Sequence, residues 1–128
     1  MKKLIGVVLL MVCLGIVVLG EWQFRSATTY TFTSSLVWTN LGTAAVRLSG
    51  FDCHFNAPAT GVLSFSRIRG SNTNVWQSYS MTSATNVLAT REEFDGLWLI
   101  LNDILLIKNT ATGTTCDVAV LNFEAQVF

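Results

Sequence analysis

An uninterrupted apolar run near the start of the chain constrains this protein most. Leu4 to Gly20 are seventeen residues without a charge, preceded by Lys2 and Lys3 and followed by Glu21. A helix rises about 1.5 Å per residue, and the hydrocarbon core of a bilayer is about 30 Å thick. The run is therefore long enough to enter or cross a membrane, and it directs the rest of the chain out of the cytoplasm.

The run is either a single transmembrane helix that is retained or a signal peptide that is removed. A signal's apolar core is usually about 7 to 15 residues long and ends at small residues. This run is longer, and Val18 and Gly20 make a poor cleavage site. Trp22 and Phe24 follow at once, and amphipathic aromatic side chains favour the membrane surface. These features favour an anchor, with cleavage as the alternative.

The basic residues around the run predict its orientation. Lys2 and Lys3 precede it, and Arg25 is the one positive residue close behind it. The positive-inside rule then places the N-terminus in the cytoplasm and residues 21–128 outside. We expect Lys2, Lys3, Trp22 and Phe24 to mark the membrane interface. The β-domain would lie outside a cell envelope or virion membrane, or would be secreted if the segment is cleaved.

Residues 21–128 are enough for one domain with a single core. They carry six Arg or Lys residues against eight Asp or Glu residues, a net charge of about −2. Such a surface offers no basic patch for phosphates, which argues against nucleic acid as a partner. Low charge with abundant Thr, Ser, Asn and aromatic residues is typical of extracellular or particle-forming β proteins.

Short alternating segments, separated by turn residues, recur along this part of the chain without an amphipathic helical stretch. They predict strands over 28–33, 36–38, 45–55, 62–68, 75–81, 97–101, 104–108 and 116–127. This spacing favours an all-β fold, an antiparallel β-sandwich that can take the form of a jelly roll, with a barrel as the alternative. The expected domains are the N-terminal segment 1–20, a tether over 21–27 and the β-sandwich 28–128.

The segment 45–55 contains a change of phase. Val46 and Leu48 point one way, whereas Phe51 is out of step with them by one residue. Gly50 lies at the change and predicts a β-bulge, which would return the later side chains to the core face. Pro58, the only proline, is expected to break the strand.

The strongest strand signal comes from the apolar runs 97–101 and 104–108. The polar pair Asn102 and Asp103 separates them. Two apolar runs joined by two polar residues predict a tight hairpin. Their nearly continuous apolar character indicates that both faces are covered.

Cys53 and Cys116 are the two cysteines of the exported part, and each lies on a predicted strand. Disulfides persist outside the cytoplasm, so these residues are a disulfide candidate. The alternative is two separate buried thiols, because free Cys behaves as a small hydrophobe. A metal site is not expected, since there is one histidine and no paired-ligand spacing.

His54 follows Cys53 directly, which raises the question of a nucleophile and its base. Neighbouring strand residues point to opposite faces, so the two cannot form a dyad. Glu92, Glu93 and Asp95 could be read as a carboxylate pair or a calcium loop, but the alternation of calcium ligands is missing. A solvated turn is the better interpretation, and we expect no catalytic residue and no cofactor.

Trp76, Arg67 and Arg69 are the candidates for contact with a partner. Trp76 falls on the polar side of its predicted strand, where an indole can stack on a sugar or fill a partner's pocket. Arg67 and Arg69 share one strand face and could bind a carboxylate of a neighbouring subunit. The alternatives are a Trp76 ring that lies under a loop and a pair of arginines that keeps a sheet edge solvated.

The segment from Leu97 to Phe123 carries a resemblance. Its hydrophobic strand, the Asn102-Asp103 turn, the strand and loop from Ile104 to Thr110 and a closing strand of Val118, Ala119, Val120 and Leu121 resemble the C-terminal hairpins of small phage virion β-sandwich proteins. The likeness is one of pattern and covers about a quarter of the chain. It implies a structural role, and the apolar segment would suit a virus with a lipid membrane.

These observations favour a non-enzymatic, membrane-tethered structural protein, a component of a virion or other surface particle. Its partners would be the lipid membrane and other protein subunits in an oligomeric assembly. The alternative is a secreted or periplasmic ligand-binding module, for instance for carbohydrate, with Trp76 as the platform.

Overall fold

The computed structural model describes residues 21–94 and 98–127, with backbone only at 21, 24–26 and 127. The expected anchor, including Lys2 and Lys3, lies outside the described residues. Within the part that is described, no helix is long and apolar enough to cross a membrane.

Alternating apolar and polar residues form strands along almost the whole of this part, and one short 3-10 helix interrupts them. The elements are β1 (Glu21–Phe32), β2 (Ser35–Thr39), β3 (Val46–Arg69), β4 (Asn72–Thr90), η1 (Arg91–Phe94), β5 (Trp98–Leu99), β6 (Ile104–Asn109) and β7 (Cys116–Val127). The prediction of an all-β antiparallel fold is confirmed, since every strand pairing is antiparallel.

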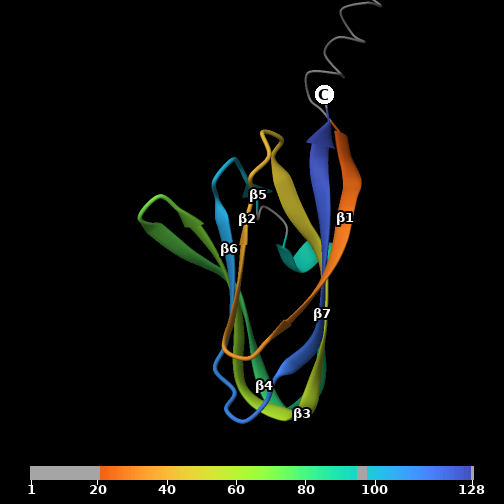
Figure 1. Cartoon of the computed structure of the whole chain (residues 1–128), viewed down its shortest axis with the longest axis vertical. Coiled ribbons are helices and arrows are strands. Elements are labelled where there is room, and N and C mark those ends of the chain that lie inside the picture. Colours follow the sequence, from red (N-terminus) through yellow and green to blue (C-terminus); the bar gives the residue numbers. More distant parts are fainter. Residues whose placement is uncertain (1–20, 95–97, 128) are drawn as a thin grey trace, which may run out of the picture.

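The strands form one hydrogen-bonded sheet that folds over on itself, with the path β1-β7-β3-β6-β2. The long strand β3 makes this possible. Its first half pairs with β7 and its second half with β6, while β4 follows its other edge. The two halves of the sheet therefore face each other, and β3 and β4 bend between them at one end of the molecule (Figure 1).

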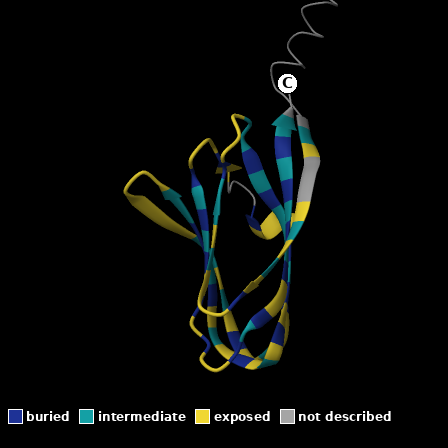
Figure 2. Ribbon diagram, viewed as in Figure 1, coloured by how far each residue is buried: buried dark blue, intermediate teal, exposed yellow. Residues whose placement is uncertain are grey.

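The core lies between these two halves. Phe51, from the first half of β3, meets Phe65, from the second half, edge to face at 4.9 Å between ring centroids. Phe94 of η1 contacts Phe65 at 4.9 Å, and all three rings are almost completely buried. Buried and exposed residues alternate along the strands (Figure 2). Each fully buried Phe contributes roughly 2 kcal/mol through loss of apolar surface from water, which makes this cluster a main source of stability.

The bulge at Gly50 is confirmed. The register between β3 and β7 shifts between Leu48 and Gly50. Val46 and Leu48 before the glycine are buried, and Phe51 and the apolar residues after it are buried as well. One extra residue therefore keeps the core face continuous across the change of phase.

The expected break at Pro58 does not occur, because β3 continues through it. The register with β4 shifts on both sides of Ala59, and this is where the strand bends from one half of the sheet to the other. A bulged bend accommodates a proline because the regular ladder is interrupted there.

Two further expectations are wrong. Residues 21–27, expected to be a tether, belong to β1, which is in register with β7 from the pair Glu21 and Val127 onward.

The runs 97–101 and 104–108 do not form a hairpin with each other. Trp98 and Leu99 pair with β3, and β6 lies between β3 and β2. The turn between the runs redirects the chain from one part of the sheet to another.

Candidate functional site

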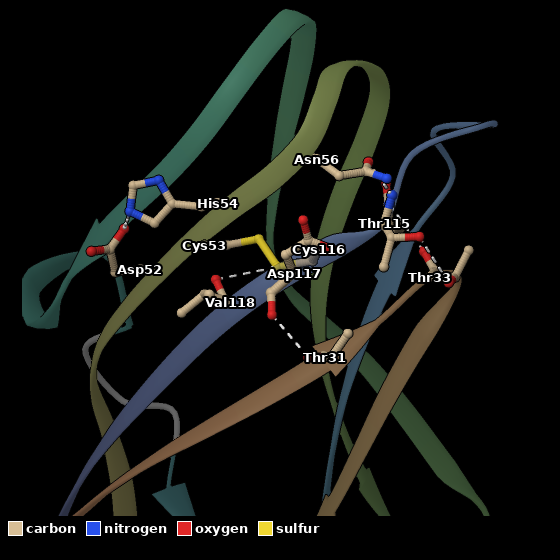
Figure 3. The surroundings of a disulfide bond; sticks show 11 residues. Thr31, Thr33, Asp52, Cys53, His54, Asn56, Thr115, Cys116, Asp117 and Val118 are labelled. Atoms are coloured by element: carbon tan, nitrogen blue, oxygen red, sulfur yellow. Dashed lines mark hydrogen bonds and ion pairs between the residues drawn. A yellow bond between two sulfur atoms is a disulfide. The ribbon is translucent and has the colours of Figure 1, made fainter.

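Cys53 and Cys116 form a disulfide bond (Figure 3). Cys53 lies in β3 and Cys116 begins the neighbouring strand β7, with 6.3 Å between the Cα atoms and a sequence separation of 63 residues. Neither residue is exposed. The disulfide candidate is therefore confirmed, and it indicates a β-domain that folds outside the reducing cytoplasm.

His54 points away from the disulfide, as the strand geometry predicts (Figure 3). Its Nε2 lies 3.6 Å from Oδ1 of Asp52, and its side chain is largely exposed. Because Cys53 is bonded to Cys116, its sulfur is not a thiolate nucleophile. The neighbourhood of the disulfide therefore does not contain a Cys-His pair.

Hydrogen bonds between separate strands surround the disulfide. Thr31 Oγ1 donates to the carbonyl of Asp117 at 2.8 Å. Asn56 and Thr115 bond reciprocally, since the Thr115 N–H donates to Asn56 Oδ1 at 2.9 Å and the Asn56 N–H donates to the Thr115 carbonyl at 3.0 Å. These bonds join β1, β3 and β7 at the end of the molecule where β3 bends (Figure 3).

Arg69 is held by an intramolecular carboxylate. Its Nε donates to Asp103 Oδ1 at 2.9 Å and its Nη2 donates to Oδ2 at 2.6 Å. Asp103 is buried and also accepts the Ile100 N–H at 2.8 Å. Hydrogen bonds from Arg69, above all, hold the pKa of Asp103 below its usual range. In this chain Arg69 therefore stabilises the turn 100–103, and contact with a neighbouring subunit stays a prediction.

Arg67 and Trp76 contact each other. The guanidinium carbon of Arg67 lies 5.1 Å from the centre of the Trp76 ring, a cation–π arrangement. Arg67 Nη1 also donates to the carbonyl of Trp98 at 3.1 Å. Trp76 is half-buried and packs against the core, whereas its neighbour Val75 is 66% exposed. Trp76, expected on the polar side of its strand, is therefore turned toward the core, because the register with β3 shifts between Phe65 and Ser66.

Trp22 packs on the sheet. The guanidinium carbon of Arg47 lies 4.3 Å from the centre of its ring, and the Trp98 ring lies 5.1 Å away at a steep angle. Arg47 in turn binds Glu124 through Nη2 at 2.7 Å. Phe24 is in backbone register with Glu124. Whether Trp22 and Phe24 mark a membrane interface stays a prediction.

Buried Asn40 organises the loop 40–44 between β2 and β3. Its Nδ2 donates to the carbonyls of Leu99 at 2.8 Å and Ala44 at 3.1 Å, and its Oδ1 accepts the Gly42 N–H at 3.0 Å. Beside this loop lies a pocket of about 450 Å³, lined by residues 38–44, 46 and 123. One wall is aromatic, because Trp38 stacks on Phe123 at 4.2 Å between ring centroids.

The acidic stretch forms the short helix η1. Glu93 Oε2 accepts the Thr90 N–H at 2.7 Å, and Phe94 is buried beneath the helix. Backbone hydrogen bonding at Glu92 is the main cause that lowers the pKa of this exposed carboxyl. Asp95 lies outside the described residues. Over 21–94 and 98–127, no group of three or more metal-ligating side chains comes together.

No protein-family model and no curated protein matches this chain. Among solved structures, it is similar to a protein chain in the structure of the infectious bursal disease virus Gx strain, with 12% sequence identity and a TM-score of 0.25. The alignment covers 84% of this chain and 40% of that chain. The chain thus spans less than half of that protein, and so distant a likeness carries no argument about its function.

Proposed function

We propose that this chain is a non-enzymatic structural protein that tethers a β-domain to a membrane, as a component of a virion or other surface particle. The observation that carries the proposal is the buried disulfide in a domain that directly follows the apolar run Leu4 to Gly20. A disulfide requires an oxidising compartment, and an apolar run of this length supplies both the route out of the cytoplasm and an attachment to the bilayer.

The use of the charged side chains supports a scaffold. Arg69 binds Asp103, and Arg47 binds Glu124 while it lies against Trp22. Each pair joins β3 to a segment that is far away in the sequence, the turn 100–103 or the neighbouring strand β7. Such contacts fix neighbouring segments of the sheet in one arrangement, as expected for a domain that presents surfaces to neighbours.

The β3–β4 hairpin is the surface through which we propose that the domain contacts other subunits. Its tip, residues 69–75, is exposed throughout and projects from the body of the molecule (Figures 1 and 2). Within the described part of the chain, β4 pairs with β3 alone. A strand with an open edge and an exposed Val75 suits contact with a neighbouring protein.

The test is recovery of the chain from its native source. We expect the intact mass, under non-reducing conditions, to match the full chain with one disulfide. We also expect the chain to stay in the membrane after alkaline carbonate extraction and to occur at fixed stoichiometry in purified particles. A mass for residues 21–128 in the soluble fraction would contradict the tether and favour a released binding module.

That module, a secreted or periplasmic carbohydrate-binding protein, is the second candidate. The pocket beside Trp38 favours it, because its volume lies in the range of small-ligand sites and its wall is aromatic. A glycan array with Trp38→Ala and Trp76→Ala variants tests it. Sugar binding by the wild type that is lost in either variant would contradict the purely structural function.

A further inference from the structure

One end of the domain, here called the proximal end, consists of the start of β1, the loop 40–44 and the segment 98–102. Several contacts show that these parts lie together. Trp22 is opposite Gln126 in register, and the Gln126 N–H donates to the Ala45 carbonyl at 2.9 Å. The Asn102 N–H donates to the Asn40 carbonyl at 2.7 Å. In Figure 1 this is the end at which the chain enters β1.

The proximal end exposes large apolar side chains at its loop tips. Leu41 is 80% exposed, Ile100 and Leu101 are each 45% exposed, and Trp98 is 41% exposed. Residues 40–44 and 98–102 contain no charged residue. These two segments therefore present apolar side chains to water and carry no charge of their own, which is unusual for loops. The charged groups beside them, Arg67 on the Trp98 carbonyl and Arg69 on Asp103, are held by partners within the domain.

The opposite, distal end has a different composition. It consists of the loops 33–34 and 110–115 and of the bends of β3 and β4 at 56–60 and 82–86, which are all composed only of Ser, Thr, Asn, Ala, Gly and Pro. Hydrogen bonds between Thr33 and Thr115, between Thr115 and Asn56 and between Ser83 and Thr60 place these segments together. The two ends of one small domain thus face different surroundings.

The apolar tips are held firmly in their exposed positions. Asn40 fixes the loop 40–44 through its side chain, and it bonds the neighbouring turn through its backbone, since its N–H donates to the Asp103 carbonyl at 3.0 Å. Asp103 closes that turn and is locked by Arg69. Three buried or paired polar residues, Asn40, Asp103 and Arg69, therefore support side chains that do not themselves enter the core.

We propose that the proximal end rests on the surface of the lipid bilayer that holds the N-terminal segment, with Leu41, Ile100 and Leu101 in the boundary between headgroups and acyl chains. The inference rests on the tether of the proposed function. The apolar run ends at Gly20, and β1 is paired with β7 from Glu21 onward. No linker separates the run from the sheet, so a bilayer that holds the run lies directly at this end. Trp22 and Trp98 add aromatic rings of the kind that favour the interface.

The experiment places a fluorescent label at single cysteines in the full chain, reconstituted in phosphatidylcholine–phosphatidylglycerol vesicles. Cys13→Ser removes the remaining thiol, and the native disulfide is verified by mass in every variant. Leu41→Cys and Leu101→Cys report on the proximal end. Val75→Cys, exposed on the hairpin, and Thr112→Cys, exposed at the distal end, are the matched controls. Quenching by spin-labelled lipids and by aqueous iodide is measured at each position.

We expect labels at 41 and 101 to be quenched by the lipids and protected from iodide, and labels at 75 and 112 to show the reverse. Equal iodide quenching at all four positions, with the chain still resistant to carbonate extraction, would overturn the docking and leave the tether intact. Loss of the chain from the vesicles would overturn the tether as well. Protection at 41 and 101 that depends on protein concentration without lipid would mean that a second copy covers this end, and would also overturn the proposal.

Discussion

At the scale of single residues, Asp103 attaches the turn 100–103 to β3 and so contributes to the stability of the domain. It is a buried carboxylate that receives two N–H groups of Arg69 and the backbone N–H of Ile100. A buried charge is tolerated only where it is paired and hydrogen-bonded, and here every partner comes from the turn or from β3. Loss of the Asp103 side chain therefore weakens both the turn and its attachment to β3.

We predict that Asp103→Asn lowers the free energy of unfolding by about 2 kcal/mol at pH 7, because a neutral amide replaces the carboxylate that Arg69 and Ile100 contact. Urea denaturation measures the change. Asp52→Asn, at a carboxylate whose side chain is 43% exposed, is the control and should change stability by less than about 0.5 kcal/mol.

The same pair predicts a pH dependence. The pKa of Asp103 is lower in the folded protein, mainly because Arg69 donates hydrogen bonds to it. Its contribution is therefore complete above the pKa of an unfolded Asp, ~3.9, and is lost as the pH falls through the lower folded value. The stability difference between the wild type and Asp103→Asn should shrink below about pH 4. A difference that stays constant down to pH 2 would contradict this account.

At the scale of elements, β3 determines the architecture. It belongs to both halves of the sheet, and its bend requires the chain to pass close to the loop 110–115. Gly61 makes this approach with a φ of +156°, and a Cβ built there would lie 2.8 Å from the backbone nitrogen of Ala111. The bend therefore depends on the absence of a side chain at this position.

We predict that Gly61→Ala destabilises the domain by about 2 kcal/mol, since backbone atoms at Ala111 cannot move aside as a side chain would. Thermal denaturation of the variant measures the loss. Gly42→Ala is the matched control, because a Cβ there would meet only Asn40 Oδ1 at an ordinary 3.5 Å. Equal stability of the two variants would show that the bend can relax.

The disulfide acts on the same elements, since it joins β3 to β7 across 63 residues. A loop of this length loses roughly 4 kcal/mol of unfolded-state entropy when it is closed. The double variant Cys53→Ala with Cys116→Ala should therefore unfold at a much lower urea concentration than the oxidised protein. The wild type measured under reducing conditions should approach the variant.

At the scale of the whole molecule, the domain has distinct surfaces at distinct places. The apolar proximal end lies where the N-terminal segment joins, the polar distal end lies at the bend of β3, and the β3–β4 hairpin projects from the side (Figure 1). This separation suits a protein that contacts a membrane at one end and other subunits through a projecting arm.

The hairpin gives a prediction for assembly. Val75→Asp should leave the stability of the isolated protein within about 0.5 kcal/mol, because the side chain is 66% exposed. We expect this variant to be incorporated into particles much less than the wild type, measured by its stoichiometry in purified particles. Val118→Asp, on an exposed part of β7, is the control. Normal incorporation of Val75→Asp would exclude the hairpin tip as an assembly contact.

The sequence by itself determined the all-β character, the bulge at Gly50 and the opposite orientations of Cys53 and His54. Each follows from the alternation of side chains along one strand, which is a local property of the chain. The sequence also offered Cys53 and Cys116 as a disulfide candidate, because they are the two cysteines of the exported part, but it left two separate thiols as the alternative.

Only the tertiary structure decided which strands pair and which polar groups meet. Trp98 and Leu99 pair with β3 and not with β6, β3 runs through Pro58, and Asp103 holds Arg69. Pairing depends on hydrogen bonds between residues far apart in the sequence, and local alternation is equally compatible with several partners. The exposed tips of the proximal end could not be recognised in the sequence either, since Leu41 and Leu101 are residues of a type that usually lies in the core. They become a surface only because Asn40 and Asp103 take the buried positions beside them.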